Sequence, residues 1–187
     1  MELLKTAIPG VLVLRPARFQ DERGFFAETF RQSWMEEAGL PAAWVQDNHS
    51  LSRRRGTIRG LHFQVPPRAQ AKLVRVVAGS VFDVAVDLRR ASPTYGWHAA
   101  FELSAASGEQ LLIPAGCAHG FCTLEADTEV LYKVTDYYSQ EHDRGLRWDD
   151  PVLGIAWPVA AGDAVLSARD RQHPALADLP DYFPGEA

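Results

Sequence analysis

Apolar residues in this chain come in short runs that alternate with polar residues, which is the pattern of β-strands. One such run covers residues 11–14, and residues 44–134 form a succession of runs separated by turn signals such as Ser107-Gly108. Only residues 31–38 predict a helix, because their apolar side chains recur on one face. Many short strands with few helices predict an all-β sandwich or barrel.

Two neighbouring runs predict a hairpin. Residues 72–78 and 81–88 have the composition of strands, and Gly79-Ser80 separates them. A two-residue link of this kind is typical of a tight turn between paired strands. In the second run Asp83 and Asp87 fall on one face, since side chains alternate along a strand.

The run over residues 44–50 is unusually polar for a strand. Its amides and hydroxyls indicate that it faces a ligand or another chain. The alternative is an edge strand, which tolerates polar side chains without any ligand.

The chain has 187 residues, a length that fits one domain over residues 1–187. Its net charge of −5 does not suit a general nucleic-acid-binding protein, and the basic run 53–55 indicates a solvated loop or a contact for a phosphorylated ligand. No signal-peptide pattern and no membrane-spanning apolar run are present. Cys117 and Cys122 are too few for a disulfide framework. We therefore expect a cytoplasmic protein that binds neither nucleic acid nor membrane.

The most informative strand covers residues 57–64, where His62 lies among apolar residues, three positions after Arg59. His62 is a candidate proton acceptor because the ordinary pKa of histidine lies near neutrality, and taken alone it is equally a core histidine. In a regular strand Arg59 and His62 point to opposite faces. Both can reach one ligand only if the strand bulges, which Gly60 permits. We therefore predict an irregularity at Gly60.

A second motif follows the apolar run that ends at Ile113. Residues 114–121 contain Pro-x-Gly-x-x-His, with His119 at the start of the next strand, and this segment resembles the second motif of the cupin superfamily. In metal-binding cupins the first motif supplies His-x-His, but here Gln64 takes the place of the second histidine. Only His62 and His119 remain as ligands, and a stable divalent site normally needs three. We therefore expect no metal.

Five motifs, taken in order, resemble the dTDP-4-dehydrorhamnose 3,5-epimerase family. They occupy residues 21–26, 46–50, 59–64, 114–121 and 148–151, and the resemblance runs from about residue 8 to about residue 170. It implies a cupin-type jelly-roll β-barrel or sandwich with a few short helices, a dTDP-sugar substrate and no cofactor. It also implies a homodimer, with N-terminal strands exchanged between subunits.

The implied reaction inverts C3 and C5 of a 4-keto sugar through an enolate, and this requires a base, an acid on the opposite face and a group that stabilises the enolate oxygen. The resemblance assigns His62 as the base and Asp170 as the carboxylate that orients it. Tyr132 is the candidate acid, although its strand position also suits a core tyrosine. Lys72 is the candidate for the enolate oxygen, although a lone lysine is more often a solvated surface residue.

The resemblance also implies a set of substrate-binding residues. Arg23 and Arg59 match positions that contact the diphosphate, where a planar guanidinium suits phosphate oxygens. The positions that hold the nucleoside or approach the diphosphate are Glu28, Gln46 and Asn48. The further substrate-binding positions are Lys72, His119, Tyr138, Asp143 and Arg169. Asp83 is a weaker candidate that supports Lys72 or His62, or is simply a buried structural acid.

Two other functions fit the same residues. A related enzyme that inverts only one carbon of a dTDP-4-keto-deoxysugar would use the same catalytic groups. A cupin-like module that binds a sugar nucleotide without turnover would not need four groups suited to proton transfer.

Overall fold

The computed structural model describes residues 1–185 of the chain. The strands are β1 (Glu2–Lys5), β2 (Leu12–Arg15), β3 (Arg18–Asp21), β4 (Gly24–Ala27), β5 (Gln46–Ser52), β6 (Ile58–Gln64), β7 (Lys72–Ala78), β8 (Ser80–Asp87), β9 (His98–Ser104), β10 (Gln110–Ile113), β11 (Cys117–Thr123), β12 (Thr128–Val134) and β13 (Asp143–Gly145). The helices are α1 (Gln32–Glu37) and a single 3-10 turn, η1 (Leu176–Asp178).

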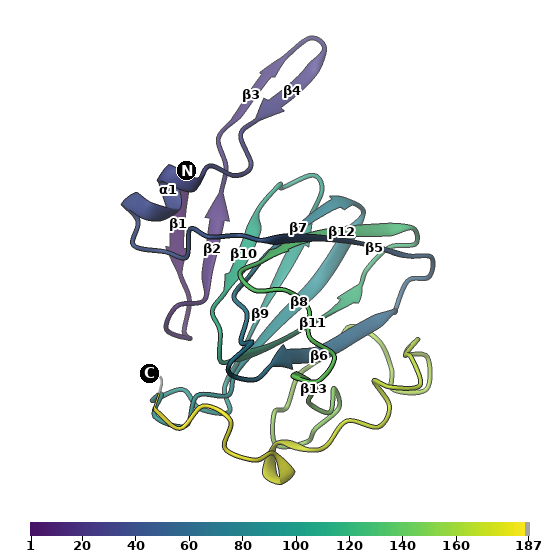
Figure 1. Ribbon diagram of the computed structural model, residues 1–187. Helices are drawn as coiled ribbons and strands as arrows, with labels where there is room; N and C mark the ends of the chain where they lie inside the picture. Colours follow the sequence, from purple (N-terminus) through teal and green to yellow (C-terminus); the bar gives the residue numbers. More distant parts are fainter. Residues whose placement is uncertain (186–187) are drawn as a thin grey trace.

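Two antiparallel sheets form a sandwich (Figure 1). The first has six strands in the order β1-β2-β10-β7-β12-β5, and the second has five in the order β13-β6-β11-β8-β9. The core between them combines residues of the first sheet, such as Val74 and Leu111, with residues of the second, such as Ala85 and Phe121. The predicted all-β sandwich is confirmed.

The C-terminal part of the chain covers the outer face of the five-stranded sheet (Figure 1). Leu61 and Val84 point outward from this sheet and pack against Leu153, Leu176 and Phe183. This sheet therefore carries buried apolar side chains on both of its faces. Burial of so many aliphatic and aromatic side chains, at about 25 cal/mol per Å² of apolar surface, fixes the C-terminal segment on the sandwich.

The predicted hairpin between residues 72–78 and 81–88 is wrong. The first run is β7, which pairs with β10 and β12, whereas the second is β8, which pairs with β9 and β11. The link at Gly79 therefore carries the chain from one sheet to the other. A short glycine-containing link allows either arrangement, and β8 is buried on both faces, which suits a central strand of the second sheet.

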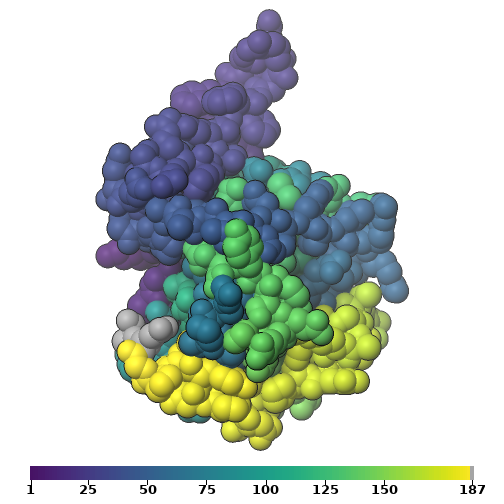
Figure 2. Space-filling model, in the orientation of Figure 1, coloured from purple at the N-terminus to yellow at the C-terminus, as the bar shows by residue number. Residues whose placement is uncertain are grey.

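The N-terminal region forms an arm that stands out from the sandwich (Figures 1 and 2). β3 and β4 form a separate two-stranded hairpin, with a polar turn at Glu22 and Arg23 between them. Three phenylalanines of this hairpin, Phe19, Phe25 and Phe26, are 64%, 59% and 69% exposed. Helix α1 follows the arm and buries Met35, as the predicted helix requires. No helix in residues 1–185 is long and apolar enough to span a membrane.

The predicted irregularity at Gly60 is confirmed. His62 lies opposite His119 on β11, and Arg59 lies opposite Phe121, so three positions on β6 match two on β11. This one-residue bulge turns Arg59 and His62 to the same face of the sheet. Gly60 has φ +118°, and a Cβ atom there would lie 2.6 Å from the carbonyl oxygen of His119.

We predict that Gly60→Ala lowers the free energy of unfolding by about 3 kcal/mol or more, because the new methyl group meets backbone atoms in a left-handed conformation. Urea denaturation at fixed protein concentration measures the change. Gly162→Ala is the matched control, since a Cβ at Gly162 has no atom within 4 Å. A loss below about 1 kcal/mol in Gly60→Ala would show that β6 does not need this close approach.

Candidate active site

Two adjoining cavities, of about 370 and 310 Å³, open between the two sheets. His62, Lys72, Tyr132 and Arg169 line both of them. His62 comes from β6 of the second sheet, whereas Lys72 and Tyr132 come from β7 and β12 of the first. The candidate base and acid therefore approach the same space from opposite layers.

Strand register explains why the first sheet presents these side chains together. Tyr132 pairs with Val74 on one side and with Asn48 on the other, and Val134 pairs with Lys72 and Gln46. Val74 belongs to the core between the sheets, so the side chains in register with it also face inward. β5 is an edge strand, as the alternative interpretation of residues 44–50 expects, and its residues Gln46 and Asn48 also line a cavity that a ligand could occupy.

His62 forms a short hydrogen bond with a buried carboxylate. Nε2 of His62 lies 2.6 Å from Oδ1 of Asp170. Since a carboxylate only accepts hydrogen bonds, the proton lies on Nε2 and the lone pair on Nδ1. Ser167 donates to Oδ2 of Asp170 at 2.8 Å and so fixes the orientation of the carboxylate.

The environment sets the charges of this pair. Burial lowers the pKa of His62 and outweighs the opposing effect of Asp170. Burial acts to raise the pKa of Asp170, but contacts with His173, His62 and Ser167 outweigh burial and hold that pKa below its usual range. At neutral pH the pair therefore consists of a neutral imidazole and a carboxylate, the resting state that a general base requires.

Lys72 is buried in the site and is not a solvated surface residue. Its Nζ donates to the carbonyl oxygen of His62 at 3.2 Å. Burial lowers the pKa of Lys72 to about 8, against the opposing effects of Asp143 and Asp83. The ammonium group remains mostly charged at neutral pH and is poorly solvated, which strengthens its attraction for a developing negative charge.

Tyr132 is both a packed residue and a cavity-lining residue. Its ring lies against the core between the sheets, and its side chain borders both cavities. Within residues 1–185 no hydrogen bond to its hydroxyl is found. Burial raises the pKa of Tyr132, partly offset by Arg59. The phenol is therefore protonated at neutral pH and has a proton to give.

His119 lies opposite His62 in the sheet and borders the smaller cavity. Its Nε2 lies 2.9 Å and 3.1 Å from the two carboxylate oxygens of Asp83. Asp83 is fully buried and favours the charged form of Lys72 electrostatically, as its candidate role implies, but its direct hydrogen-bond partner is His119. The register explains this, since Asp83 and His119 lie on paired strands two positions apart.

The remaining predicted binding residues divide into two groups. One group borders the cavities: Arg59, Gln46, Asn48, Tyr138, Asp143 and Arg169. Within it, Arg169 forms an ion pair of 2.6 Å with Asp143, which also accepts from the Tyr138 hydroxyl at 3.3 Å. Arg59 donates to Ser52 at 3.0 Å.

The other group, Arg23 and Glu28, is not brought to the cavities within this chain. Arg23 lies at the tip of the arm, where its side chain is 85% exposed and pairs with Asp21. Glu28 pairs with Arg31 at 2.6 Å, beside helix α1. Neither residue lines either cavity, so in this chain the site lacks two of its expected contacts.

Comparison with known proteins identifies the family. The dTDP-4-dehydrorhamnose 3,5-epimerase family model matches residues 5–178. The dTDP-4-dehydrorhamnose 3,5-epimerases of Sinorhizobium fredii and Pseudomonas aeruginosa are 54% and 51% identical to this chain, covering 95% and 98% of it and 90% and 100% of the relatives. The chain belongs to the dTDP-4-dehydrorhamnose 3,5-epimerase family. The predicted family and its epimerase activity are thereby confirmed.

Solved structures of the family share the fold. The dTDP-4-dehydrorhamnose 3,5-epimerase of Bacillus anthracis, with TDP and PPi bound, has a TM-score of 0.90 at 46% identity over 93% of this chain and 98% of its own. The Legionella pneumophila enzyme, in complex with dTDP-4-keto-L-rhamnose, has a TM-score of 0.93 at 40% identity over 100% and 99%. A 3'-monoepimerase from Streptomyces bikiniensis is more distant, at 32% identity, a TM-score of 0.86, and coverage of 93% and 87%. The predicted double epimerase is therefore favoured over the single-carbon alternative.

Several residues of this candidate site are not predicted from the sequence. Ser167 holds Asp170, and Gln64 and Gln70 border the larger cavity. The hydroxyl of Ser50 is buried beside the smaller cavity and has no hydrogen-bond partner among residues 1–185, so it is available to a ligand. His173 packs against His62, and its spacing of three from Asp170 is the only signal in the sequence.

His62, Asp170 and His173 form one cluster of potential metal ligands. Ligand atoms of His62, Asp170 and His173 lie within 4.8 Å of one another. Zinc with bonds of about 2.1 Å holds tetrahedral ligands about 3.4 Å apart. The separation of 2.6 Å between Nε2 of His62 and Oδ1 of Asp170 is instead that of a short hydrogen bond to a charged group. The donor atoms are therefore arranged as a hydrogen-bonded pair with a neighbouring imidazole.

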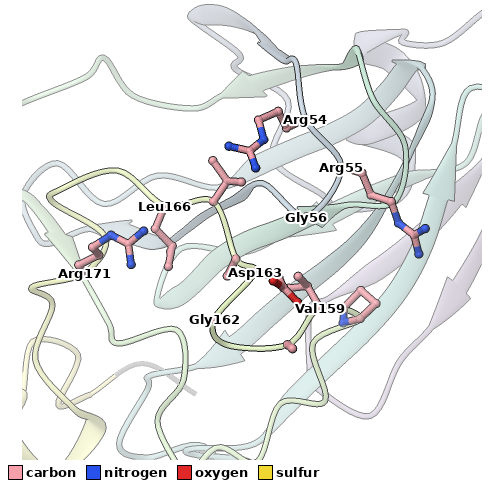
Figure 3. A pocket seen from close by; sticks show the side chains of 12 residues that line it. Arg54, Arg55, Gly56, Val159, Gly162, Asp163, Leu166 and Arg171 are labelled. Atoms are coloured by element: carbon pink, nitrogen blue, oxygen red, sulfur yellow. The ribbon is translucent and has the colours of Figure 1, made fainter.

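A larger cavity, of about 680 Å³, lies next to the segment that carries Asp170 (Figure 3). Arg54, Arg55 and Arg171 border it together with Asp163, and the rest of its lining is mostly apolar. It contains none of the predicted site residues and no histidine, tyrosine or lysine. Two residues of the basic run, Arg54 and Arg55, therefore border a separate surface hollow and not the cavities that contain His62.

We predict that Lys72→Met raises the free energy of unfolding at pH 7 by up to about 3 kcal/mol, because the wild-type protein buries a charge whose pKa is lowered from 10.5 to about 8. Below pH 8 both the folded and unfolded wild-type states hold this proton, so the difference is full. Between pH 8 and 10.5 the unfolded state holds more protons, so wild-type stability rises and the difference shrinks.

Denaturation curves from pH 7 to 10.5 at fixed protein concentration measure this difference. Lys133→Met on β12 is the control, since Lys133 forms a surface ion pair with Asp47 and its loss changes stability by less than about 1 kcal/mol. A stability difference for Lys72→Met that stays constant across this range would show that the pKa of Lys72 is not lowered by burial.

Proposed function

We propose that this chain converts dTDP-4-dehydro-6-deoxy-D-glucose to dTDP-4-dehydro-L-rhamnose, inverting C3 and C5 with His62 as base and Tyr132 as acid. The observation that carries the assignment is the placement of an oriented neutral imidazole and a free phenol in one space, on opposite sheets. Inversion needs this arrangement, because the proton must leave one face of the sugar ring and return to the other.

In each inversion Nδ1 of His62 takes the proton from the carbon next to the ketone. The electron pair of the C–H bond moves into the ring, and the carbonyl oxygen becomes an enolate oxygen. Asp170 stabilises the imidazolium that forms, since its carboxylate accepts from Nε2 at 2.6 Å. Tyr132 then gives its proton to the opposite face of the same carbon, and the ketone is restored. Solvent takes the proton from His62 and returns one to Tyr132 before the next inversion.

Lys72 stabilises the enolate between these steps. Its ammonium is buried and charged at neutral pH, and it lies at the boundary of the same cavities as His62 and Tyr132. A positioned charge in a poorly hydrated site lowers such a barrier by roughly 3–4 kcal/mol. The same ammonium opposes protonation of His62, which helps to keep the base in its neutral form.

The dTDP part of the substrate binds along the polar surface beside the catalytic groups. Arg59 and Arg169 carry the positive charge of this surface, and Gln46, Asn48 and Tyr138 supply hydrogen-bonding groups. Guanidinium groups suit diphosphate oxygens. The relatives from B. anthracis and L. pneumophila, which hold TDP and dTDP-4-keto-L-rhamnose, support this assignment.

We predict that the wild-type protein, incubated with the 4-keto sugar nucleotide in deuterated water, incorporates deuterium at C3 and C5. His62→Ala abolishes this exchange, because the base is absent. Tyr132→Phe retains some exchange but yields little inverted product, because the enolate forms but is not protonated on the opposite face. NMR of the sugar hydrogens reads both outcomes.

Three results would contradict this proposal in different ways. Exchange at one carbon with inversion only there would favour the single-carbon epimerase. Tight binding without any exchange would favour a binding module. Full exchange in His62→Ala would remove His62 from the role of base.

We further propose that the protein acts as a homodimer in which each arm completes the site of the partner subunit. The arm stands out from the sandwich and exposes three phenylalanines, which a second copy would cover. Arg23 and Glu28 lie on or beside this arm, away from the cavities of their own chain. Exchange of the arms brings both residues to a second site, where the resemblance to the family expects them.

A complementation experiment tests this arrangement. We predict that Arg23→Ala raises KM at least about tenfold, because a charged diphosphate contact is lost. When Arg23→Ala and His62→Ala proteins are unfolded, mixed in equal amounts and refolded, half of the dimers are mixed and each has one intact site. At substrate concentrations well below KM, activity therefore returns to about a quarter of wild type. If Arg23 served its own chain, mixing would restore no activity.

A further inference from the structure

A second imidazole lies against the His62–Asp170 pair and takes no part in the steps above. The ring of His173 meets the ring of His62 edge to face, with 5.5 Å between centroids and 82° between planes. Its Nε2 lies 3.5 Å from Oδ1 of Asp170. This is the same oxygen that accepts the hydrogen bond from His62. One carboxylate oxygen thus faces two imidazoles.

The environment of His173 fixes which of its nitrogens carries the proton. Nε2 is buried and has no conventional hydrogen-bond partner within residues 1–185. A buried N–H directed toward an anion is stabilised, whereas a buried lone pair directed toward the same anion is repelled. Nε2 of His173 therefore carries a proton that points toward Asp170, in a contact too long for a strong hydrogen bond.

The fold leaves space for this ring at one position. Gly145 on β13 pairs directly with His62 on β6. A Cβ atom at Gly145 would lie 2.2–2.4 Å from three ring atoms of His173. The φ of Gly145 lies outside the left-handed region, so its backbone conformation does not require glycine. A glycine is needed here because a side chain would overlap the ring of His173. The glycine opposite the base is therefore what admits the second imidazole.

The electrostatic consequence follows from the shared oxygen. A donor that approaches Oδ1 of Asp170 draws on the charge that otherwise attracts the His62 proton. The other groups that act on His62 are Lys72 on β7, which opposes its protonation, and Asp143 on β13, which favours it. Ser167 binds the other oxygen of Asp170. Loss of His173 leaves all of these groups in place.

We propose that His173 is a positioning residue of this epimerase, which holds Asp170 beside His62 and weakens the pull of that carboxylate on the imidazolium. The inference rests on the proposed function, in which neutral His62 is the base. Without the His173 contact, Asp170 is more basic and stabilises protonated His62 more strongly. The fraction of enzyme with a free base then falls at slightly acidic pH.

The first test compares pH profiles of kcat/KM, which report ionisations of the free enzyme. His173→Leu removes the donor, and we expect the acidic limb to move to higher pH by about 0.5 to 1 unit. The activity below the limb then falls about three- to tenfold, while the plateau at higher pH is retained. His173→Gln keeps an N–H at the position of Nε2 and restores the wild-type limb. Gln172→Ala, at an exposed neighbouring position, is the matched control.

A second variant, on β13, disturbs the same contact between His173 and Asp170. Gly145→Ala displaces the ring of His173 and should move the acidic limb in the same direction. In the His173→Ala background the added methyl group has free space, so it should cause no further movement. Gly162→Ala, where a Cβ meets no atom within 4 Å, controls for the substitution itself. Gly145→Ala and His173→Ala, alone and together, form a double-mutant cycle. The cycle separates a general loss of stability from the loss of the contact between His173 and Asp170.

NMR titration of the His62 ring in the substrate-free protein separates this inference from the proposed function. A rise in the pKa of His62 in His173→Leu, with a parallel movement of the kinetic limb, supports both. An unchanged pKa of His62 in both His173→Leu and Gly145→Ala overturns the role of His173. A raised pKa with an unmoved kinetic limb supports the contact but overturns His62 as the base.

Discussion

At Gly60 the backbone of β6 approaches that of β11 so closely that no side chain fits between them. The bulge formed there places Arg59 and His62 on the inner face of the sheet, although a spacing of three would separate them in a regular strand. The guanidinium proposed to bind the diphosphate and the imidazole proposed as the base thus reach one cavity from one strand. The hydrogen bond of His62 with Asp170, and the cavity that His62 shares with Lys72 and Tyr132, depend on this placement.

Given that placement, the charges of the site follow from burial. The sandwich excludes water from Lys72 and from Asp170, and it supplies each with neighbours that decide its charge. Desolvation keeps His62 neutral, whereas Asp170 stands ready to stabilise its protonated form. These opposing effects are typical of catalytic sites, where a group must change charge readily in both directions.

Sequence patterns could predict the elements and most of the site because these depend on local alternation and on motifs. The polar edge strand β5 and the bulge at Gly60 follow from residue types over a few positions. The link at Gly79 could not be predicted, because in-plane and between-sheet turns share the same local residues. The partner of Asp83 depends on the pairing of β8 with β11, which is set by the tertiary fold.

The arm shows a different limit. Its residues match the family in sequence, yet the fold of one chain leaves Arg23 at an exposed tip. A sequence motif does not indicate whether a residue serves the site of its own chain or, as in the proposed homodimer, the site of a second copy. His173 belongs to no motif, and its role depends only on its distances to His62 and Asp170, which the sequence does not show.

A crystal structure of the protein with the 4-keto sugar nucleotide, or an unreactive analogue, bound would show directly whether His62 and Tyr132 act on opposite faces of the sugar. We expect the hexose ring to lie between His62 and Tyr132, with the imidazole Nδ1 facing one side of C3 and C5 and the phenol oxygen facing the other. The keto oxygen should point toward Nζ of Lys72. A hexose bound in the hollow beside Arg54, or one that meets both groups on the same face, would contradict the account.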